Sequence, residues 1–245
     1  MTIAAPQAAI AEKPLLKISD LHAWYGESHV LHGIELELSE GQLITLLGRN
    51  GAGRTTTLRA IMGLVDRRTG SIRLGSEEFI HKPVHRIAPA GKIGYCPEER
   101  GIFSSLTVEE NLLLPPVVGE GGMSLEAIYQ MFPNLREVRK RMGTRLSGGE
   151  QQMLAIARIL RTGARLLLLD EITEGLAPVI VKALGEAIRK LKSEGYTIVL
   201  VEQNFRFAAE VADRHYIIEH GRVMDRIDHA DVSTSMDKLN HYLSI

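Results

Sequence analysis

A glycine-rich segment has the composition of a phosphate-binding loop. Residues 48–55 read GRNGAGRT; they follow an apolar run, Leu43 to Leu47, that predicts a buried strand, and they open a helical pattern from Thr55 to Met62. Glycines let the backbone fold around an anion with its amide hydrogens pointing inward, and the helix N-terminus adds a favourable dipole. A turn that binds no ligand is the alternative. The predicted phosphate contacts are Gly48, Arg49, Asn50, Gly51, Ala52, Gly53, Arg54, Thr55 and Thr56, and the Thr55 hydroxyl could also ligate Mg2+.

The residue before Thr55 departs from the usual pattern of such loops. The pattern has lysine there, a compact point charge that reaches the β and γ phosphates, whereas this chain has Arg54. Arginine keeps the charge but is longer, planar and forked, and the two side chains are not interchangeable at a tight site. We expect phosphate binding to persist through the backbone amides, and the catalytic alignment to be altered.

An acidic pair follows a second buried strand. Four leucines at 166–169 precede Asp170 and Glu171, and such an uninterrupted apolar run is typical of a strand covered on both faces. The strand would deliver Asp170 to its carboxyl end, where it could hold Mg2+, and Glu171 could polarise an attacking water as general base. Acidic pairs also occur at ordinary surface turns. A functional role for this pair is indicated by its occurrence after the loop at 48–55.

A second candidate anion site begins at Leu146, where residues 146–152 read LSGGEQQ. A serine hydroxyl and glycine amides at the start of a helix form a nest suited to a terminal phosphate. The segment resembles the LSGGQ or LSGGE signature of the ATP-binding cassette (ABC) ATPases, and the resemblance covers the chain from about Leu15 to its end. It implies that ATP is the substrate and that two cassettes enclose two ATP molecules. The signature residues, which would face the partner's ATP, are Ser147, Gly148, Gly149 and Glu150.

The resemblance also assigns roles outside these motifs. Tyr25 matches the aromatic residue that stacks on adenine, with a core tyrosine as the alternative. Glu98 stands at the Q-loop position, usually glutamine, and Gln203 stands at the position of the switch histidine. The implied catalytic residues are Glu171 and Gln203; the implied Mg2+ ligands are Thr55, Glu98 and Asp170; and the implied D-loop residues are Glu174, Gly175 and Leu176.

Four segments narrow the resemblance to an ATPase subunit of the high-affinity branched-chain amino acid importers. They read GYCPEER at 94–100, FSSLTVEENL at 103–112, GLAP at 175–178 and VEQN at 201–204. In that subfamily a glutamate at 98 and a glutamine at 203 are ordinary replacements. The resemblance implies a second homologous ATPase subunit, transmembrane permease subunits and, indirectly, a periplasmic or extracellular solute-binding protein.

Three alternatives stay open. Importers of urea and short amides look similar to the branched-chain importers. Arg54 motivates the second alternative, a cassette with weak hydrolysis that completes its partner's site. The third is a cassette that acts in translation or DNA repair, where a second cassette or a long coiled-coil insertion is usual and is not seen in this sequence.

These motifs require a scaffold in which strand ends meet helix starts. The strand–helix alternation predicts an α/β fold with a mainly parallel sheet, and the resemblance specifies a P-loop NTPase with an antiparallel β subdomain and a helical subdomain at about residues 100–147. Thr107 and Glu110 have the spacing of a capping box. We expect a flexible tail at residues 1–14 and one ABC ATPase domain at 15–245. Further strands are predicted at 15–18, 30–38, 71–80, 197–201, 216–218 and 222–226, and a helix at 179–191.

Composition limits the class of protein. The chain has 245 residues, a formal net charge of -1 and 44% hydrophobic residues, typical of an ordinary globular protein and without the basic excess of nucleic-acid-binding proteins. The one cysteine, Cys96, cannot form an internal disulfide, which favours a reducing compartment. No apolar run approaches the roughly 20 residues that cross a bilayer. The resemblance implies a peripheral protein on the cytoplasmic face of the cell membrane, and the charge balance favours no nucleic-acid partner.

Overall fold

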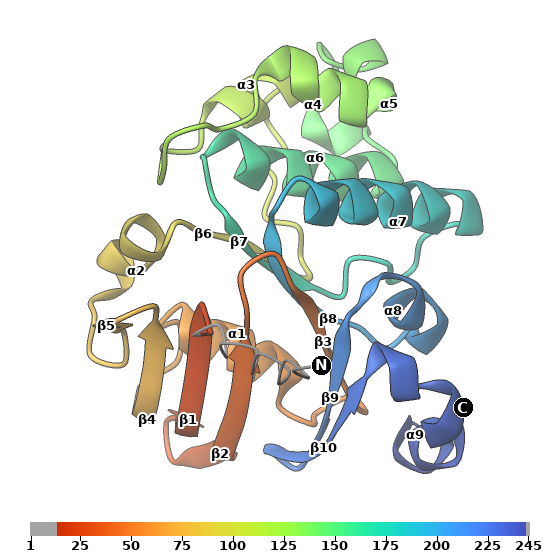
Figure 1. The fold of residues 1–245 in the computed structure, drawn as a ribbon. Coiled ribbons are helices and arrows are strands. Elements are labelled where there is room, and N and C mark those ends of the chain that lie inside the picture. The colour runs from red at the N-terminus through yellow and green to blue at the C-terminus, as the bar shows by residue number, and fades with distance from the viewer. Residues whose placement is uncertain (1–13, 244–245) are drawn as a thin grey trace, which may run out of the picture.

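A six-stranded sheet forms the centre of the molecule, in a computed structural model that describes residues 14–243 (Figure 1). The predicted tail at 1–14 lies outside these residues except for Pro14. The strand order is β10-β9-β3-β8-β7-β6; all neighbours run parallel except the antiparallel pair of β9 and β10. The strands are β3 (Leu43–Leu47), β6 (Ile93–Cys96), β7 (Leu166–Asp170), β8 (Thr197–Val201), β9 (Arg214–Glu219) and β10 (Arg222–Asp228). The predicted α/β class with a mainly parallel sheet is confirmed.

Both faces of this sheet are covered, as the leucine run in β7 predicts. Leu166 and Leu168 pack in one core with helix α1 (Arg54–Ile61) and a second sheet, while Leu167 and Leu169 pack in another core with helices on the opposite face. Successive strand residues point to opposite faces, so a strand buried on both sides must be apolar at every position. Each fully buried leucine contributes about 1.5–3 kcal/mol.

The second sheet is antiparallel and has the order β2-β1-β4-β5. Its strands are β1 (Leu16–Tyr25), β2 (Ser28–Leu38), β4 (Arg67–Leu74) and β5 (Glu77–Glu78). The single strand predicted at 71–80 is wrong, because it is divided between β4 and β5, and residues 69–70, which precede the predicted strand, lie inside β4. Gly70 permits this: a Cβ there would lie 2.1 Å from the Asp20 carbonyl oxygen, so only glycine allows the two strands to approach at this irregularity.

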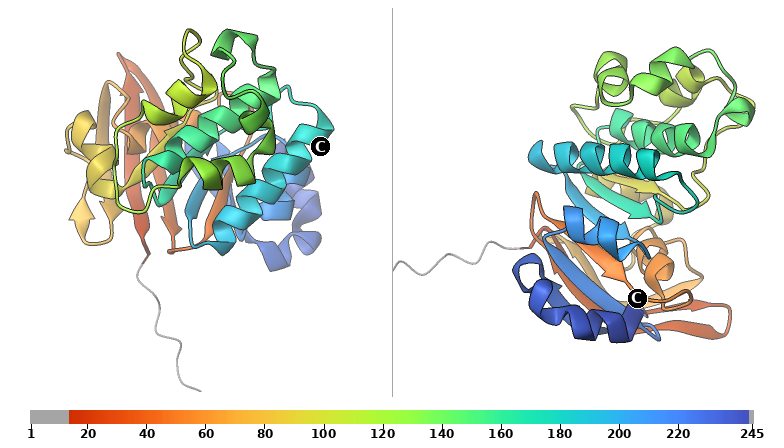
Figure 2. Two further views of the ribbon diagram at one scale, coloured as in Figure 1. Left: turned by 90° about the horizontal axis from the view of Figure 1, so that it is seen from above. Right: turned by 90° about the vertical axis from the view of Figure 1, so that its right-hand side faces the viewer.

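A helical segment between β6 and β7 lies at the end of the molecule opposite helix α9 (Figures 1 and 2). Its helices are α3 (Val108–Leu113), α4 (Leu125–Met131), α5 (Pro133–Glu137) and α6 (Gly148–Arg161), with a 3-10 turn at Gly143–Arg145. The capping box predicted at Thr107 is present, since the Thr107 hydroxyl accepts from the Glu110 amide and the Glu110 carboxylate accepts from the Thr107 amide. The residue bounds of the domain and its helical subdomain stay a prediction.

The remaining helices connect or cover the strands. They are α2 (Val84–Gly91), α7 (Pro178–Ser193), α8 (Phe205–Val211) and α9 (Met236–Leu243), with 3-10 turns at His229–Asp231 and Ser233–Ser235. Figure 1 shows α6 and α7 lying across the same side of the central sheet. Among residues 14–243, no helix combines the length and the apolar character required to span a bilayer.

Candidate functional site

The carboxyl ends of four parallel strands surround a cavity of about 290 Å³. The segments that follow β3, β6, β7 and β8 each contribute to its wall, which is where open α/β sheets place their ligands. The lining residues are Val30, Asn50, Gly51, Ala52, Gly53, Arg54, Thr55, Thr56, Glu98, Glu171, Glu174 and Gln203. Gly48 and Arg49 join β3 to this group, and Arg49 lines a neighbouring cavity together with His220 and Tyr242.

The phosphate loop, residues 48–55, runs into the N-terminus of α1. The first residues of this helix line the cavity, so their backbone N–H groups lie beside it. Gly53 is the N-cap and supplies no side-chain cap to the first turn. The first amides of a helix have no partner within the helix, so they are available to an anion that enters the cavity. The geometry therefore suits the phosphate binding that the glycine spacing predicts, and the individual contacts of residues 48–56 remain a prediction.

The guanidinium of Arg54 is buried and joins three separate segments. Its side chain is only 4% exposed. It donates to Asn50 Oδ1 at 3.1 Å, Glu171 Oε1 at 2.9 Å and the Glu202 carbonyl oxygen at 2.9 Å. The guanidinium already forms an ion pair with the Glu171 carboxylate. A phosphate that binds Arg54 must therefore compete with Glu171.

Asp170 lies at the end of β7 in direct contact with the phosphate loop. The Thr55 hydroxyl donates to Asp170 Oδ1 at 3.0 Å, and the Tyr95 hydroxyl donates to Oδ2 at 3.4 Å. Burial, opposed by the Thr55 hydrogen bond and assisted by the nearby charge of Glu171, raises the pKa of Asp170 to about 6. A cation beside Asp170 would favour its ionised form and so oppose this shift.

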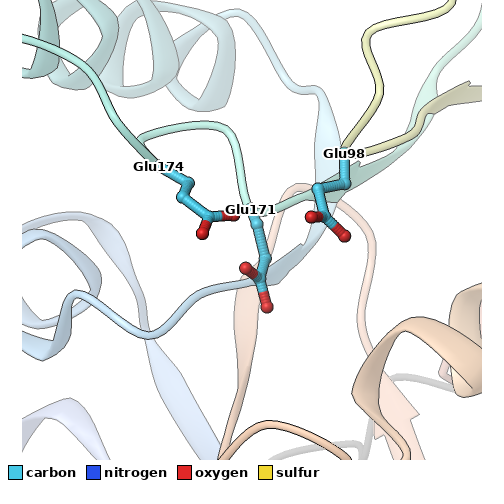
Figure 3. A group of neighbouring side chains, drawn as sticks. All are labelled: Glu98, Glu171 and Glu174. Atoms are coloured by element: carbon cyan, nitrogen blue, oxygen red, sulfur yellow. The ribbon is translucent and has the colours of Figure 1, made fainter.

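Glu171 sits in a strained backbone conformation and points into the cavity between two other carboxylates (Figure 3). Its φ is 46°, which is uncommon for a residue with a side chain and requires support from the surrounding structure. Gln203 Nε2 donates to Glu171 Oε2 at 2.8 Å, so both carboxylate oxygens are held. A hydrogen bond and charge repulsion from Glu171 raise the pKa of Glu174.

The oxygen donors around the cavity fit Mg2+. The Thr55 hydroxyl and the Asp170 carboxylate are adjacent, and carboxylate oxygens of Glu98, Glu171 and Glu174 lie within 4.8 Å of one another. Mg2+ prefers hard oxygen ligands, and a cation would offset the repulsion between these carboxylates. Thr55, Glu98 and Asp170 are thus chemically suited to the role that the sequence predicts for them.

The signature residues form a different group, at the start of α6. The Ser147 hydroxyl accepts from the Glu150 amide at 3.3 Å, and Glu150 Oε2 accepts from the Ser147 amide at 2.7 Å, so both side chains serve as a helix cap. Leu176 of the predicted D-loop, which follows Gly175, lies against this helix start, 3.6 Å from where a Cβ on Gly148 would be. None of the residues that line the phosphate cavity, all within 14–243, belongs to the signature group.

Tyr25 ends β1 at the turn into β2, outside the set of residues that line the cavity. Val30, further along β2, is an apolar residue of that set. The Tyr25 hydroxyl is engaged by Arg59 of α1, whose pKa this hydrogen bond raises. The stacking role proposed for Tyr25 stays a prediction.

Glu202, which precedes Gln203, is a residue of the site that the motifs do not indicate. Glu202 is 2% exposed and binds Thr173 through its carboxylate, while its carbonyl oxygen binds Arg54. The available signal is an acidic residue that continues the apolar run of β8 directly into the site.

The chain is similar to several known proteins in sequence and in fold. The family model described as "ABC transporter" matches residues 31–174. A high-affinity branched-chain amino acid transport ATP-binding protein of Pseudomonas aeruginosa is 39% identical over 86% of this chain and 91% of its own length. A probable branched-chain amino acid transport ATP-binding protein of Archaeoglobus fulgidus is 36% identical over 85% of this chain and 90% of its own. The solved structure of an ATP-binding subunit of an ABC transporter has a TM-score of 0.77 and 28% identity, covering 94% of this chain and 100% of its own.

These matches establish the family. The chain belongs to the ABC transporter family, as an ATP-binding cassette with the P-loop NTPase fold.

Proposed function

We propose that this chain is an ATP-binding and ATP-hydrolysing subunit of an importer for branched-chain or related amino acids. The observation that carries the proposal is the meeting of the phosphate loop, Asp170, Glu171 and Gln203 around one cavity. The substrate class rests on two relatives whose names state branched-chain amino acid transport. Importers of urea or short amides remain the alternative for the cargo.

The cavity supplies one half of an ATP site, and the signature of a second cassette supplies the other half. This division explains why Ser147 to Glu150 lie apart from the phosphate cavity of their own chain, with a helix start available to a partner. Binding of ATP draws the two cassettes together, and hydrolysis lets them separate. The partner is a homologous ATPase subunit.

Several polar residues in and beside the cavity have a task in this cycle. The loop amides and Arg54 bind the phosphates, Glu171 accepts a proton from the attacking water, and Gln203 holds the Glu171 carboxylate in place. Thr55, Asp170 and Glu98 hold Mg2+, which supplies charge neutralisation at the phosphate oxygens.

Transmembrane permease subunits anchor the chain at the cytoplasmic face of the cell membrane and receive the movement of the cassettes. The loop of Glu98 and the helical segment carry the contact. A solute-binding protein on the other side delivers the cargo and acts on this chain only through the permease.

A second candidate function is a cassette with weak hydrolysis that completes its partner's site. The ion pair between Arg54 and Glu171 favours it, because it engages the carboxylate that would have to accept a proton from the attacking water. In this case turnover of the complex does not depend on Glu171 of this chain.

Purification of the chain with its native partners, followed by reconstitution into proteoliposomes, tests the importer function. We expect ATP-dependent uptake of radiolabelled leucine, with urea and acetamide as competitors that leave uptake unchanged. Uptake of the amides in place of leucine would move the cargo to the alternative class, and copurification with nucleic acid or ribosomes alone would refute a transport function.

A further inference from the structure

We propose that Glu202 is a positioning residue for ATP hydrolysis, one that fixes the loop after β7 to the loop after β8 and so holds Glu171 against Gln203. The inference rests on the proposed function, in which Glu171 is the general base of this chain. Glu202 is not among the residues that line the phosphate cavity, so it acts through its neighbours.

The carboxylate of Glu202 binds both loops. Its Oε1 accepts from the Thr173 amide at 3.1 Å, and its Oε2 accepts from the Thr173 hydroxyl at 2.9 Å. Oε2 also accepts from the Asn204 amide at 3.4 Å. Thr173 is two residues after Glu171, so this buried carboxylate ties the segment that carries the base to the segment that carries Gln203.

The backbone of Glu202 extends the connection to the phosphate loop. Its carbonyl oxygen accepts from Arg54 Nη1 at 2.9 Å, while the next residue, Gln203, donates to Glu171 Oε2 at 2.8 Å. Arg54 in turn donates to Glu171 Oε1 at 2.9 Å. A displacement of Glu202 would therefore move both groups that orient the Glu171 carboxylate.

A buried carboxylate at this position lowers the stability of the fold, so its presence requires an explanation. Glu202 is 2% exposed, and its side chain forms no ion pair with any residue in the described range. Burial of a charge without a counter-ion is unfavourable. A glutamine of the same shape would avoid that cost, but in either amide orientation its NH2 group would face a backbone N–H donor, of Thr173 or of Asn204. Only the carboxylate, in its ionised form, accepts from all the donors at once.

The test is the steady-state ATPase activity of the full chain in its complex, with kcat and KM measured separately. In Glu202→Gln we expect kcat to fall about tenfold and KM for ATP to change less than about twofold, because a small misplacement of the base slows chemistry while the phosphate loop still binds. Thr173→Val removes the hydroxyl and should lower kcat, whereas Thr173→Ser should restore it. The double variant Glu202→Gln/Thr173→Val should be no slower than Glu202→Gln alone, since the two changes break one contact.

Glu186→Gln is the matched control, the same chemical change on the exposed face of α7, and should leave kcat and KM unchanged. A Glu202→Gln variant with wild-type kcat, or with raised KM and unchanged kcat, would overturn the positioning role, as would effects of Glu202→Gln and Thr173→Val that simply multiply. If Glu202→Gln does not fold, Thr173→Val against Thr173→Ser decides alone. Failure of the proposed function is distinct, because then the wild-type complex hydrolyses no ATP or Glu171→Gln hydrolyses as fast as the wild type.

Discussion

Arg54 replaces the lysine expected in a phosphate loop, and its contacts suit the larger side chain. The planar fork reaches Asn50, Glu171 and the Glu202 carbonyl oxygen together, in a site that is almost closed to solvent. A lysine ammonium is a single point of charge and cannot span these acceptors. The surrounding segments are thus fitted to arginine.

Replacement of Arg54 by lysine should therefore destabilise the nucleotide-free protein. We expect Arg54→Lys to lower the free energy of unfolding by about 1–3 kcal/mol, because a buried carbonyl oxygen or a carboxylate oxygen loses its donor. Chemical denaturation without nucleotide measures this, with Arg206→Lys on the exposed side of α8 as the control. Equal stability of Arg54→Lys and the wild type would show that the fork is not required.

Sequence could identify the residues of the phosphate site better than their partners. The spacing of Gly48 to Thr55 indicates a loop before a helix, which depends on neighbouring residues. The acceptors of Arg54 include groups 117 and 148 positions away in the chain, and no local pattern encodes such a pairing. For the same reason the ion pair with Glu171 became visible only in the folded chain.

At the scale of elements, the boundaries predicted for buried strands agree with the structure where the pattern was purely apolar. β3 and β8 span the residues expected for them, because strands covered on both faces need apolar side chains at every position. Helix α2 was missed, since Pro89 within it argues against a helix. β1 and β4 begin and end at other residues than predicted, because their length depends on pairing with each other across a long stretch of chain.

Two buried titratable groups lie on or beside β8 and β9, the strands on either side of β3, and respond to pH in opposite directions. Burial raises the pKa of Glu202, after β8, from 4.5 to about 7. Burial lowers the pKa of His215, on β9, from 6.5 to about 4. Between pH 4.5 and about 7 the folded protein holds a proton on Glu202 that the unfolded chain has released. Between about pH 4 and 6.5 it lacks a proton on His215 that the unfolded chain binds. The Glu202 contribution to stability is present below pH 4.5 and is lost as pH rises to 7; that of His215 is present above pH 6.5 and is lost as pH falls to 4.

Single replacements should separate the two contributions. Across about pH 4.5–6.5, removal of Glu202 in Glu202→Gln should make the slope of unfolding free energy against pH more positive than in the wild type, by up to about 1.4 kcal/mol per pH unit. Removal of His215 in His215→Gln should make it more negative by a similar amount. Urea denaturation at a series of pH values measures both slopes. Parallel curves for either variant and the wild type would contradict the pKa shift of that residue.

At the scale of the whole molecule, the two proposed anion-binding groups, the phosphate cavity and the start of α6, have no residue in common. Gly149 has a packing reason of its own, because a Cβ there would lie 2.9 Å from Ile180 of α7. A Cβ on Gly148 would meet its nearest neighbours at 3.6 Å, which is ordinary contact. Gly148 is thus the position where a role toward a partner's ATP can be tested without disturbing the fold.

Gly148→Ala should lower turnover of the assembled complex by about tenfold or more, because a methyl group would obstruct amide donors aimed at the partner's nucleotide. Its melting temperature should match that of the wild type. Thermal unfolding and ATPase activity measure the two effects side by side. Unchanged turnover in a correctly folded variant would remove the signature of this chain from the partner's site.

Hydrolysis at this chain's own half of the site is the central claim, and Glu171 tests it most directly. The measurement is the rate of ATP hydrolysis by the purified complex at saturating Mg-ATP, with wild-type chain, Glu171→Gln or the exposed control Glu186→Gln. We predict that Glu171→Gln loses roughly 100-fold or more of the activity attributable to this site, since a general base contributes at least that much, while Glu186→Gln keeps it. Full turnover in Glu171→Gln would contradict catalysis by this chain and would leave it the role of completing its partner's site.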